Sequence, residues 1–290
     1  MREKEILEKL QKDLEVRGRS AVTIKDYTLK IRLYQEYYNA PADELGIEEI
    51  QNYLHYLLTE KKLSASTVNT YNSAFRFVYG VTLDVALNYK KIVRAAQTRR
   101  LPQLFTREEV GQIIENAGNL CHKAMLMLAY GSGLRLNEIT GLKVSDIESK
   151  ENRILVRHGK GDRDRYAMLP KATLEVLREY WLSCKPRPRD WLFESPREGG
   201  RYYNRTLQDA FKSALRRSGI KKHGTLHTLR HCFATHLYED GNNLLALKKL
   251  LGHVRIDTTA WYTQLAASDV LKLKSPVDSL PKPRKRRGAK

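Results

Sequence analysis

The chain contains 290 residues and carries a formal net charge of +19. A chain of this length can form two domains of ordinary size, and so large a positive surplus most often indicates a nucleic-acid partner, although ribosomal and membrane-surface proteins share it. Three scattered cysteines exclude a disulfide framework and a zinc-spaced cluster, and the sequence shows neither a signal peptide nor an apolar run of the roughly 20 residues that span a membrane, so we expect a cytoplasmic, nucleoid-associated protein with no membrane partner.

Four segments in the first 100 residues have apolar positions at helical spacing, with turn-forming residues between them. They cover residues 3–17, 21–38, 47–60 and 64–79. This pattern predicts a small all-α domain over residues 1–97. The basic stretch Lys90–Arg100 follows, which we interpret as leading into an interdomain linker that lies near phosphate, with the linker itself at residues 98–104. The predicted DNA-binding residues of the basic stretch are Lys90, Lys91, Arg94, Arg99 and Arg100.

The rest of the chain predicts a second domain, residues 105–270, that is mainly α with a small β-sheet. Thr106 and Glu109 have the spacing of a capping box, which starts a helix. Two alternating strands around a glycine-flanked turn predict a hairpin at 153–168, and residues 191–193 predict a short strand. Further helical patterns cover residues 120–131, 136–142, 171–183, 204–218, 226–240 and 243–251.

A basic tail occupies residues 271–290. Six of its last ten residues are Lys or Arg, so this segment can bind any polyanion, and a nuclear-localisation signal is the alternative interpretation. Its predicted DNA-binding residues are Arg284, Lys285, Arg286 and Arg287. The first 100 residues have a net charge of +4, from 17 basic and 13 acidic side chains, which leaves +15 for the remainder.

Residues suited to metal-free phosphodiester chemistry occur in order near the end of the second domain. Arg230 can bind a phosphate in a forked geometry, and His227 and His253 can exchange protons near neutral pH. The phenol of Tyr262 can attack phosphorus. A phosphorane carries more charge than one arginine offsets, and Arg135 is the candidate for the second cation.

These motifs resemble the tyrosine recombinase family, also called the phage-integrase or Xer-type recombinases. The resemblance rests on HTLRHCFATHLYEDG, LLGH and TTAWYT, on YGSGLRLNEITGLKVSDI around Arg135, and on the hairpin that contains Lys160. Tyr262 follows His253 by nine positions, the spacing of that family. The resemblance implies a helical, SAM-like core-binding domain that clamps DNA and an α-rich catalytic domain, in a homo-tetramer on two duplex recombination sites, with accessory proteins as further candidate partners.

The resemblance also implies a mechanism without cofactor, metal or ATP. Tyr262 would form a 3′-phosphotyrosyl link, while Arg135 and Arg230 would hold the non-bridging oxygens. Lys160 would protonate the leaving 5′-oxygen, with proton transfer assisted by His227. His253 would stabilise the phosphorane, and strand exchange would proceed through a Holliday junction.

Two further residues are predicted to support the site, and several alternatives remain. Glu138 would position neighbouring basic groups, with a surface ion pair as its alternative role, and His231 would orient the site. The helix face with two histidines could bind zinc, but Thr228 stands where a metalloprotease needs glutamate. The motifs alone leave open a type IB topoisomerase and a catalytically silent DNA-binding relative, and a metal-dependent nuclease would need a carboxylate cluster. Residues 274–280 look closest to integron and transposon-associated integrases.

Overall fold

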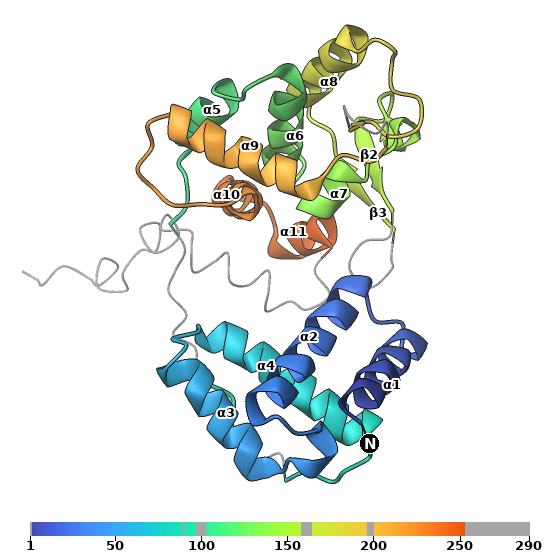
Figure 1. The fold of residues 1–290 in the computed structure, drawn as a ribbon. Helices are drawn as coiled ribbons and strands as arrows, with labels where there is room; N and C mark the ends of the chain where they lie inside the picture. Colours follow the sequence, from blue (N-terminus) through green and yellow to red (C-terminus); the bar gives the residue numbers. More distant parts are fainter. Residues whose placement is uncertain (1, 89, 97–102, 158–163, 196–199, 253–290) are drawn as a thin grey trace, which may run out of the picture. The chain divides into compact units, whose positions relative to one another are not determined.

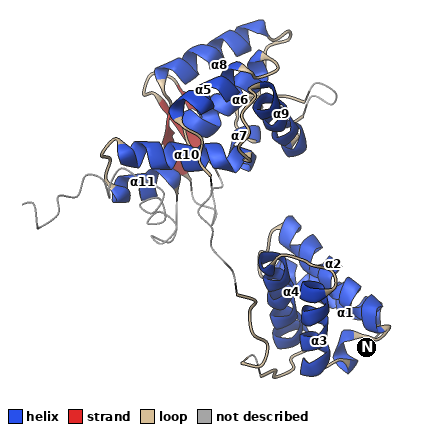
Figure 2. Cartoon of the chain, turned by 90° about the vertical axis from the view of Figure 1, so that its left-hand side faces the viewer, coloured by secondary structure: helices blue, strands red, loops and turns tan. Residues whose placement is uncertain are grey.

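A computed structural model describes residues 2–88, 90–96, 103–157, 164–195 and 200–252 (Figure 1). The chain divides into two compact units, Met1–Arg100 and Leu101–Lys290. In the described residues the first unit contains helices and no strand, and the second is helical with one small sheet (Figure 2). The predicted fold class, mainly α with a small β-sheet, is therefore confirmed.

The described part of the first unit contains four α-helices, whose bounds agree with the predicted segments to within two residues. They are α1 (Glu3–Val16), α2 (Ala21–Tyr38), α3 (Ile47–Thr59) and α4 (Ala65–Phe77), with a 3-10 turn at Ala42–Glu44 and a π-helical turn at Val78–Thr82. Ser20 and Ser64 begin two of these helices, because each hydroxyl accepts a hydrogen bond from the backbone amide three residues later.

Aromatic side chains form much of the first unit's core. The rings of Tyr53 and Phe75 meet the ring of Tyr34 edge to face, with centroids 5.2 and 4.7 Å away. Ile92 is fully buried in the same core, and the backbone of Ala95 exchanges two hydrogen bonds with the side chain of Asn69. Residues 90–96 of the basic stretch therefore pack on the first unit.

The second unit is built around α6 (Leu120–Gly131). This helix is apolar on most of its surface because α8 (Lys171–Ser183), α9 (Asn204–Arg217) and α10 (Leu226–Glu239) all pack against it (Figures 1 and 2). The other helices are α5 (Arg107–Glu115), α7 (Leu136–Thr140) and α11 (Leu244–Leu251). The predicted capping box is present, with the Thr106 side chain accepting from Glu109 N and the Glu109 carboxylate accepting from Thr106 N.

The sheet has three antiparallel strands in the order β1 (Ile147–Glu148), β2 (Arg153–Val156) and β3 (Arg165–Met168). The hairpin is as predicted, and Ile154 pairs with Ala167 on the buried face. β1 was not predicted because two residues are too few to show a pattern. Trp191 makes a single bridge to Lys143 rather than a strand.

Helix α7 ends two residues earlier than predicted. Its last residue is Thr140, and the chain then leaves the helical path so that the carbonyl of Leu142 can accept a hydrogen bond from the amide of Leu192. Among the described residues no helix has the length and hydrophobicity to cross a membrane.

Candidate active site

The candidate site begins at the N-terminal end of α7, where Arg135 and Glu138 face each other. Arg135 is the residue before the first turn and has an extended backbone, so its amide has no partner within the helix. The Glu138 carboxylate accepts from this amide at 2.8 Å and from Nη1 of Arg135 at 2.7 Å. The three-residue spacing seen in the sequence therefore brings the carboxylate under the guanidinium.

Arg230 reaches the same place from α10. Its side chain is only 1 % exposed, and its Nη1 lies 3.8 Å from Oε2 of Glu138. Nη1 also donates to the carbonyl of Gly133, and Nη2 donates to the carbonyl of Leu251 at 2.6 Å. Burying a guanidinium requires this many partners, since an unpaired buried charge is strongly destabilising.

Gly133 is essential to this approach. Its φ is +62°, and a Cβ built on it would lie 2.4 Å from Cδ1 of Phe233 on α10. A side chain at this position would push α10 away and separate the carbonyl of Gly133 from Arg230. Gly133 of the YGSGLR motif therefore helps to position Arg230.

Arg165 is a third arginine at the site, and sequence analysis did not select it. It lies on β3 and binds Glu138 through two parallel bonds, Nη1 to Oε1 and Nη2 to Oε2, both 2.8 Å long. The alternation of side chains along the strand could have indicated it. Arg165 is two residues before buried Ala167 and so lies on the same face of β3, and an arginine on the buried face of a strand needs a carboxylate partner.

The C-terminal end of α11 closes the site with backbone carbonyls. Gly252 ends this helix in the left-handed conformation, with φ +62°. Nη2 of Arg135 donates to the carbonyls of Leu251 and Gly252 at 3.3 and 3.4 Å, and Nε of Arg165 donates to that of Leu250 at 3.2 Å. The negative end of a helix dipole thus faces the arginines.

Three guanidinium groups share one carboxylate, so the described part of the site has an excess of positive charge. Burial by itself would raise the pKa of Glu138, but hydrogen bonds and charge from Arg165, followed by Arg135, outweigh it and lower the pKa to about 2. Glu138 is therefore ionised at neutral pH. The uncompensated positive charge favours an anion at the site.

His227 and His231 lie one turn apart on α10, with ring centroids 4.5 Å apart and planes at 81°. His227 is exposed on one side, yet protein atoms around its ring lower its pKa, and the charges of Arg230 and Arg135 add to this. Burial, followed by the charges of His227 and Arg230, lowers the pKa of His231 to about 4. Both rings are therefore neutral at pH 7.

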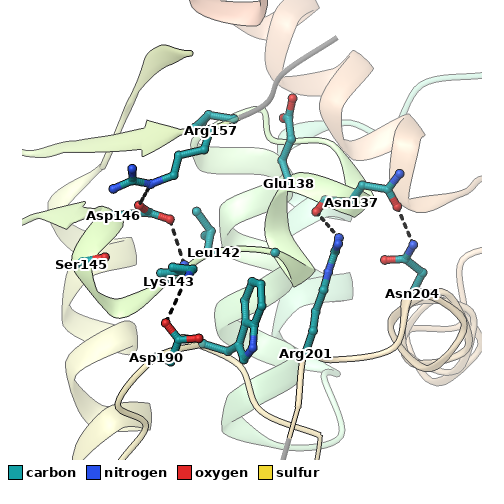
Figure 3. Close-up of a pocket in the computed structure, with 13 residues that line it drawn as sticks. Asn137, Glu138, Leu142, Lys143, Ser145, Asp146, Arg157, Asp190, Arg201 and Asn204 are labelled. Carbon is teal, nitrogen blue, oxygen red and sulfur yellow. Dashed lines mark hydrogen bonds and ion pairs between the residues drawn. The ribbon is translucent and has the colours of Figure 1, made fainter. Parts of the chain in front are cut away.

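Two cavities lined by described residues flank α7. The smaller, about 340 Å³, is lined by Leu136, Lys212 and His227 among others. The larger, about 890 Å³, lies on the side of Glu138, and Figure 3 shows the residues around it. Its polar wall is already paired: Lys143 binds Asp190, and Arg201 donates to the carbonyl of Asn137 (Figure 3).

Arg135, Glu138, His227, Arg230 and His231 are thus brought together by the structure. Other predicted catalytic residues, namely Lys160, His253 and Tyr262, lie outside the described residues, as do Arg99, Arg100 and the four basic tail residues Arg284, Lys285, Arg286 and Arg287. Lys90, Lys91 and Arg94 are exposed on the first unit. In the described ranges no group of three or more His, Cys, Asp or Glu side chains could hold a metal ion.

Comparisons with known proteins agree with this geometry. The chain matches the model of the phage integrase family over residues 103–269 and that of the phage integrase N-terminal SAM-like domain over residues 6–88. It is 31 % identical to an integrase/recombinase of Escherichia coli, with 97 % of this chain and 95 % of that protein covered. It is also 30 % identical to the tyrosine recombinase XerA of Pyrococcus horikoshii, with 90 % of this chain and 89 % of that protein covered.

Among solved structures, a lambda integrase tetramer bound to a Holliday junction has the same fold. The TM-score is 0.72 at 22 % sequence identity, over 89 % of this chain and 76 % of that chain. The SAM-like match accounts for the helical first unit, and the catalytic match spans the arginine cluster, the helix α10 motif and the end of α11. The chain therefore belongs to the phage integrase family and is a tyrosine-type site-specific DNA recombinase.

Proposed function

We propose that this chain cleaves DNA at specific recombination sites with Tyr262 as the nucleophile and rejoins the strands through a 3′-phosphotyrosyl intermediate. The tyrosine oxygen forms a bond to the scissile phosphorus, and the bond from phosphorus to the 5′-oxygen breaks. Attack by a 5′-hydroxyl of the partner duplex reverses the step and releases Tyr262. The phosphotyrosyl bond conserves the energy of the phosphodiester, so neither ATP nor a metal is required.

The single observation that supports this proposal is the convergence of Arg135, Arg165 and Arg230 on one ionised carboxylate, Glu138. The surplus positive charge matches a phosphate whose own charge grows in the transition state. Arg135 and Arg230 come from the two family motifs, and we assign them to the two non-bridging oxygens. Arg135 is the more accessible, at 23 % exposure of its side chain against 1 % for Arg230.

Proton transfer requires a base for the attacking phenol and an acid for the leaving oxygen. His227 suits the first role because its lowered pKa keeps the ring neutral near pH 7. We assign the second role to Lys160, which would give its proton to the 5′-oxygen as the bond breaks, and we assign stabilisation of the phosphorane to His253. His231 packs against His227 and would hold that ring in place.

We further propose an assembly of four copies on two DNA duplexes, as in the solved lambda integrase tetramer on a Holliday junction. In this proposal residues 1–97 clamp the DNA, residues 98–104 connect the units, residues 105–270 carry the chemistry and the basic tail 271–290 adds affinity for DNA. Accessory proteins are further candidate partners, and the location that fits these roles is the nucleoid in the cytoplasm.

The exposed side chains of Lys90, Lys91 and Arg94 test the DNA-clamping proposal separately. Each phosphate that a basic residue neutralises adds about 0.9 to the slope of log K against log salt concentration. Replacing all three with alanine should reduce that slope by up to about three such steps. An unchanged slope in a fluorescence-anisotropy titration would show that these residues do not contact phosphate.

Covalent trapping tests the chemistry. Wild type and Tyr262→Phe are incubated in EDTA with a pool of nicked duplexes that contain a randomised central segment, and protein–DNA adducts are isolated in detergent. We expect adducts with wild type only, and sequencing the trapped DNA then provides the recombination site. Adducts that form equally with Tyr262→Phe would exclude this tyrosine as the nucleophile.

A second assay on the recovered site separates recombination from strand relaxation by a type IB topoisomerase. Two labelled duplexes that carry the site should exchange strands and form a Holliday junction with the wild-type protein. Relaxation of a supercoiled plasmid without exchange between the duplexes would favour the topoisomerase reaction. Tight binding without any adduct would favour a DNA-binding relative that has lost catalysis.

A further inference from the structure

We propose that Arg165 is a positioning residue for the reaction, which acts through Glu138 and the end of α11 to hold Arg135 and Arg230 at the scissile phosphate. The inference rests on the proposed function, because it takes these two arginines as the groups that bind the phosphate. Arg165 lies in the same hairpin as Lys160, and the sequence comparison assigned it no role.

The first support is how completely Arg165 satisfies Glu138. Its two terminal nitrogens bind both carboxylate oxygens in a planar fork. The side chain of Arg135 binds only Oε1, and Nη1 of Arg230 lies 3.8 Å from Oε2. Without Arg165, the carboxylate would be held only by the amide and Nη1 of Arg135 and would attract the other two guanidiniums more strongly. Each would then be drawn toward Glu138 and away from an incoming phosphate.

The second support is that Arg165 joins three separate pieces of chain. It starts β3, its fork lies on α7, and its Nε donates to the carbonyl of Leu250 at the end of α11. Gly252 fits against it, since a Cβ on Gly252 would lie 2.8 Å from Cδ of Arg165. The carbonyls that accept from Arg135 and Arg230 belong to this same turn, so Arg165 fixes their positions too.

The third support is how the nitrogens of Arg165 are bonded. Both terminal nitrogens bind one carboxylate at 2.8 Å and Nε binds a backbone carbonyl, whereas Nη2 of Arg135 contacts only carbonyls at 3.3 and 3.4 Å. For Arg165 to turn to a ligand, two short charged bonds would have to break, while Nη2 of Arg135 would give up only its longer contacts. Arg165 therefore acts through other residues and Arg135 acts on the DNA.

The test compares Arg165→Lys and Arg165→Ala with wild type on the site recovered by covalent trapping. Lysine keeps the charge but cannot make the fork or bind two elements at once. We expect both variants to bind the duplex with unchanged affinity but to form the covalent adduct on the order of 100-fold more slowly at saturating protein, as a displacement of about 1 Å can produce. Arg153→Ala, in the same sheet but paired with Glu148, is the matched control and should cleave at the wild-type rate.

A second substrate separates positioning from general damage to the fold. A methylphosphonate at the scissile position lacks one negative oxygen and so needs less positive charge in the transition state. The deficit of Arg135→Ala, the benchmark, should shrink at least about tenfold on this substrate, in keeping with the loss of one charge-stabilising donor, and the deficit of both Arg165 variants should shrink with it.

The outcomes are distinct. Arg165→Lys cleaving within threefold of wild type overturns the inference, since charge alone would then suffice. A deficit of the Arg165 variants that is equal on both substrates, while that of Arg135→Ala shrinks, overturns the inference and leaves the proposed function standing. A deficit of Arg135→Ala that is equal on both substrates overturns the assignment of Arg135 to the phosphate, and the inference fails with it.

Discussion

Replacing Glu138 with glutamine should destabilise the second unit by about 3 kcal/mol at pH 7. The carboxylate is 7 % exposed, and a pKa lowered from 4.5 to about 2 corresponds to about 3 kcal/mol in favour of the ionised form. The variant loses this stabilisation and leaves Arg165 without its partner, and breaking a buried ion pair costs a similar amount, about 3–5 kcal/mol. Both figures estimate the free energy of the bonds between the Glu138 carboxylate and its arginine partners, so they agree and are not added.

The pH dependence of this difference follows from its sign. A carboxyl group with a lowered pKa in the folded state stabilises the fold above its unfolded pKa, and the contribution is lost as pH falls through the folded value. The difference between wild type and Glu138→Gln should therefore be full above pH 4.5 and shrink toward pH 2. At neutral pH the variant should recover part of its stability when a duplex with the recombination site binds, because phosphate neutralises the arginines.

Urea unfolding followed by tryptophan fluorescence measures the second unit alone, because Trp181, Trp191 and Trp261 all lie beyond residue 100. Glu148→Gln is the matched control: its carboxylate pairs with Arg153 and is 30 % exposed, so we expect a loss of at most about 1 kcal/mol. A Glu138→Gln variant within about 1 kcal/mol of wild type at pH 7, or a difference that is constant down to pH 3, would refute the reasoning.

Three further substitutions test individual parts of the second unit by the same unfolding assay. Gly133→Ala should cost roughly 2–5 kcal/mol, because its backbone is left-handed and a Cβ would lie 2.4 Å from the ring of Phe233. Gly219→Ala is the control: its φ is also positive but no atom lies within 4 Å, so it should cost only about 1 kcal/mol. Equal losses in the two variants would contradict the clash with Phe233. Thr106→Ala removes the cap of α5 and should cost about 1 kcal/mol, and a loss near zero would mean that solvent replaces the cap. The free energy of unfolding should fall as pH drops from 6.5 toward 4, because His231 is protonated in the unfolded chain and neutral in the folded one over this range. His231→Gln should make the free energy of unfolding less dependent on pH in this range, and an unchanged pH dependence would mean that other groups cause it.

Most helices could be predicted from the sequence because their signals are local. Capping residues such as Ser20, Ser64 and Thr106 begin helices through bonds to amides three residues away, and apolar spacing marks the buried face. Where the prediction was wrong, the cause was not local. Helix α7 ends early because Leu142 pairs with Leu192, and β1 exists only because the hairpin is beside it.

The candidate site, like the helices, could be predicted only where its contacts are local in the sequence. Arg135 and Glu138 are near neighbours in the sequence, so their pairing could be expected from helical spacing. The meeting of Arg230 with the carbonyl of Gly133 joins residues 97 positions apart, and spacing carries no information about it. Strand alternation could have placed Arg165 on the buried face, but it could not identify Glu138 as the partner, since the fork crosses from the sheet to α7.

The arrangement also explains why a charged cluster that is costly to bury can persist at this place. Arg230 and Arg165 would each be destabilising alone at 1 and 11 % exposure, and Glu138 with the carbonyls that end α11 supplies their bonds. These partners hold the guanidiniums in the absence of DNA, so little reorganisation is needed when a phosphate arrives. Among the described residues one carboxylate faces three arginines, and Arg135, at 23 % exposure, is the most accessible of them to an incoming anion. The same residues that stabilise the free protein thereby leave a surplus of positive charge in the described part of the site, which is what a site for a scissile phosphate requires.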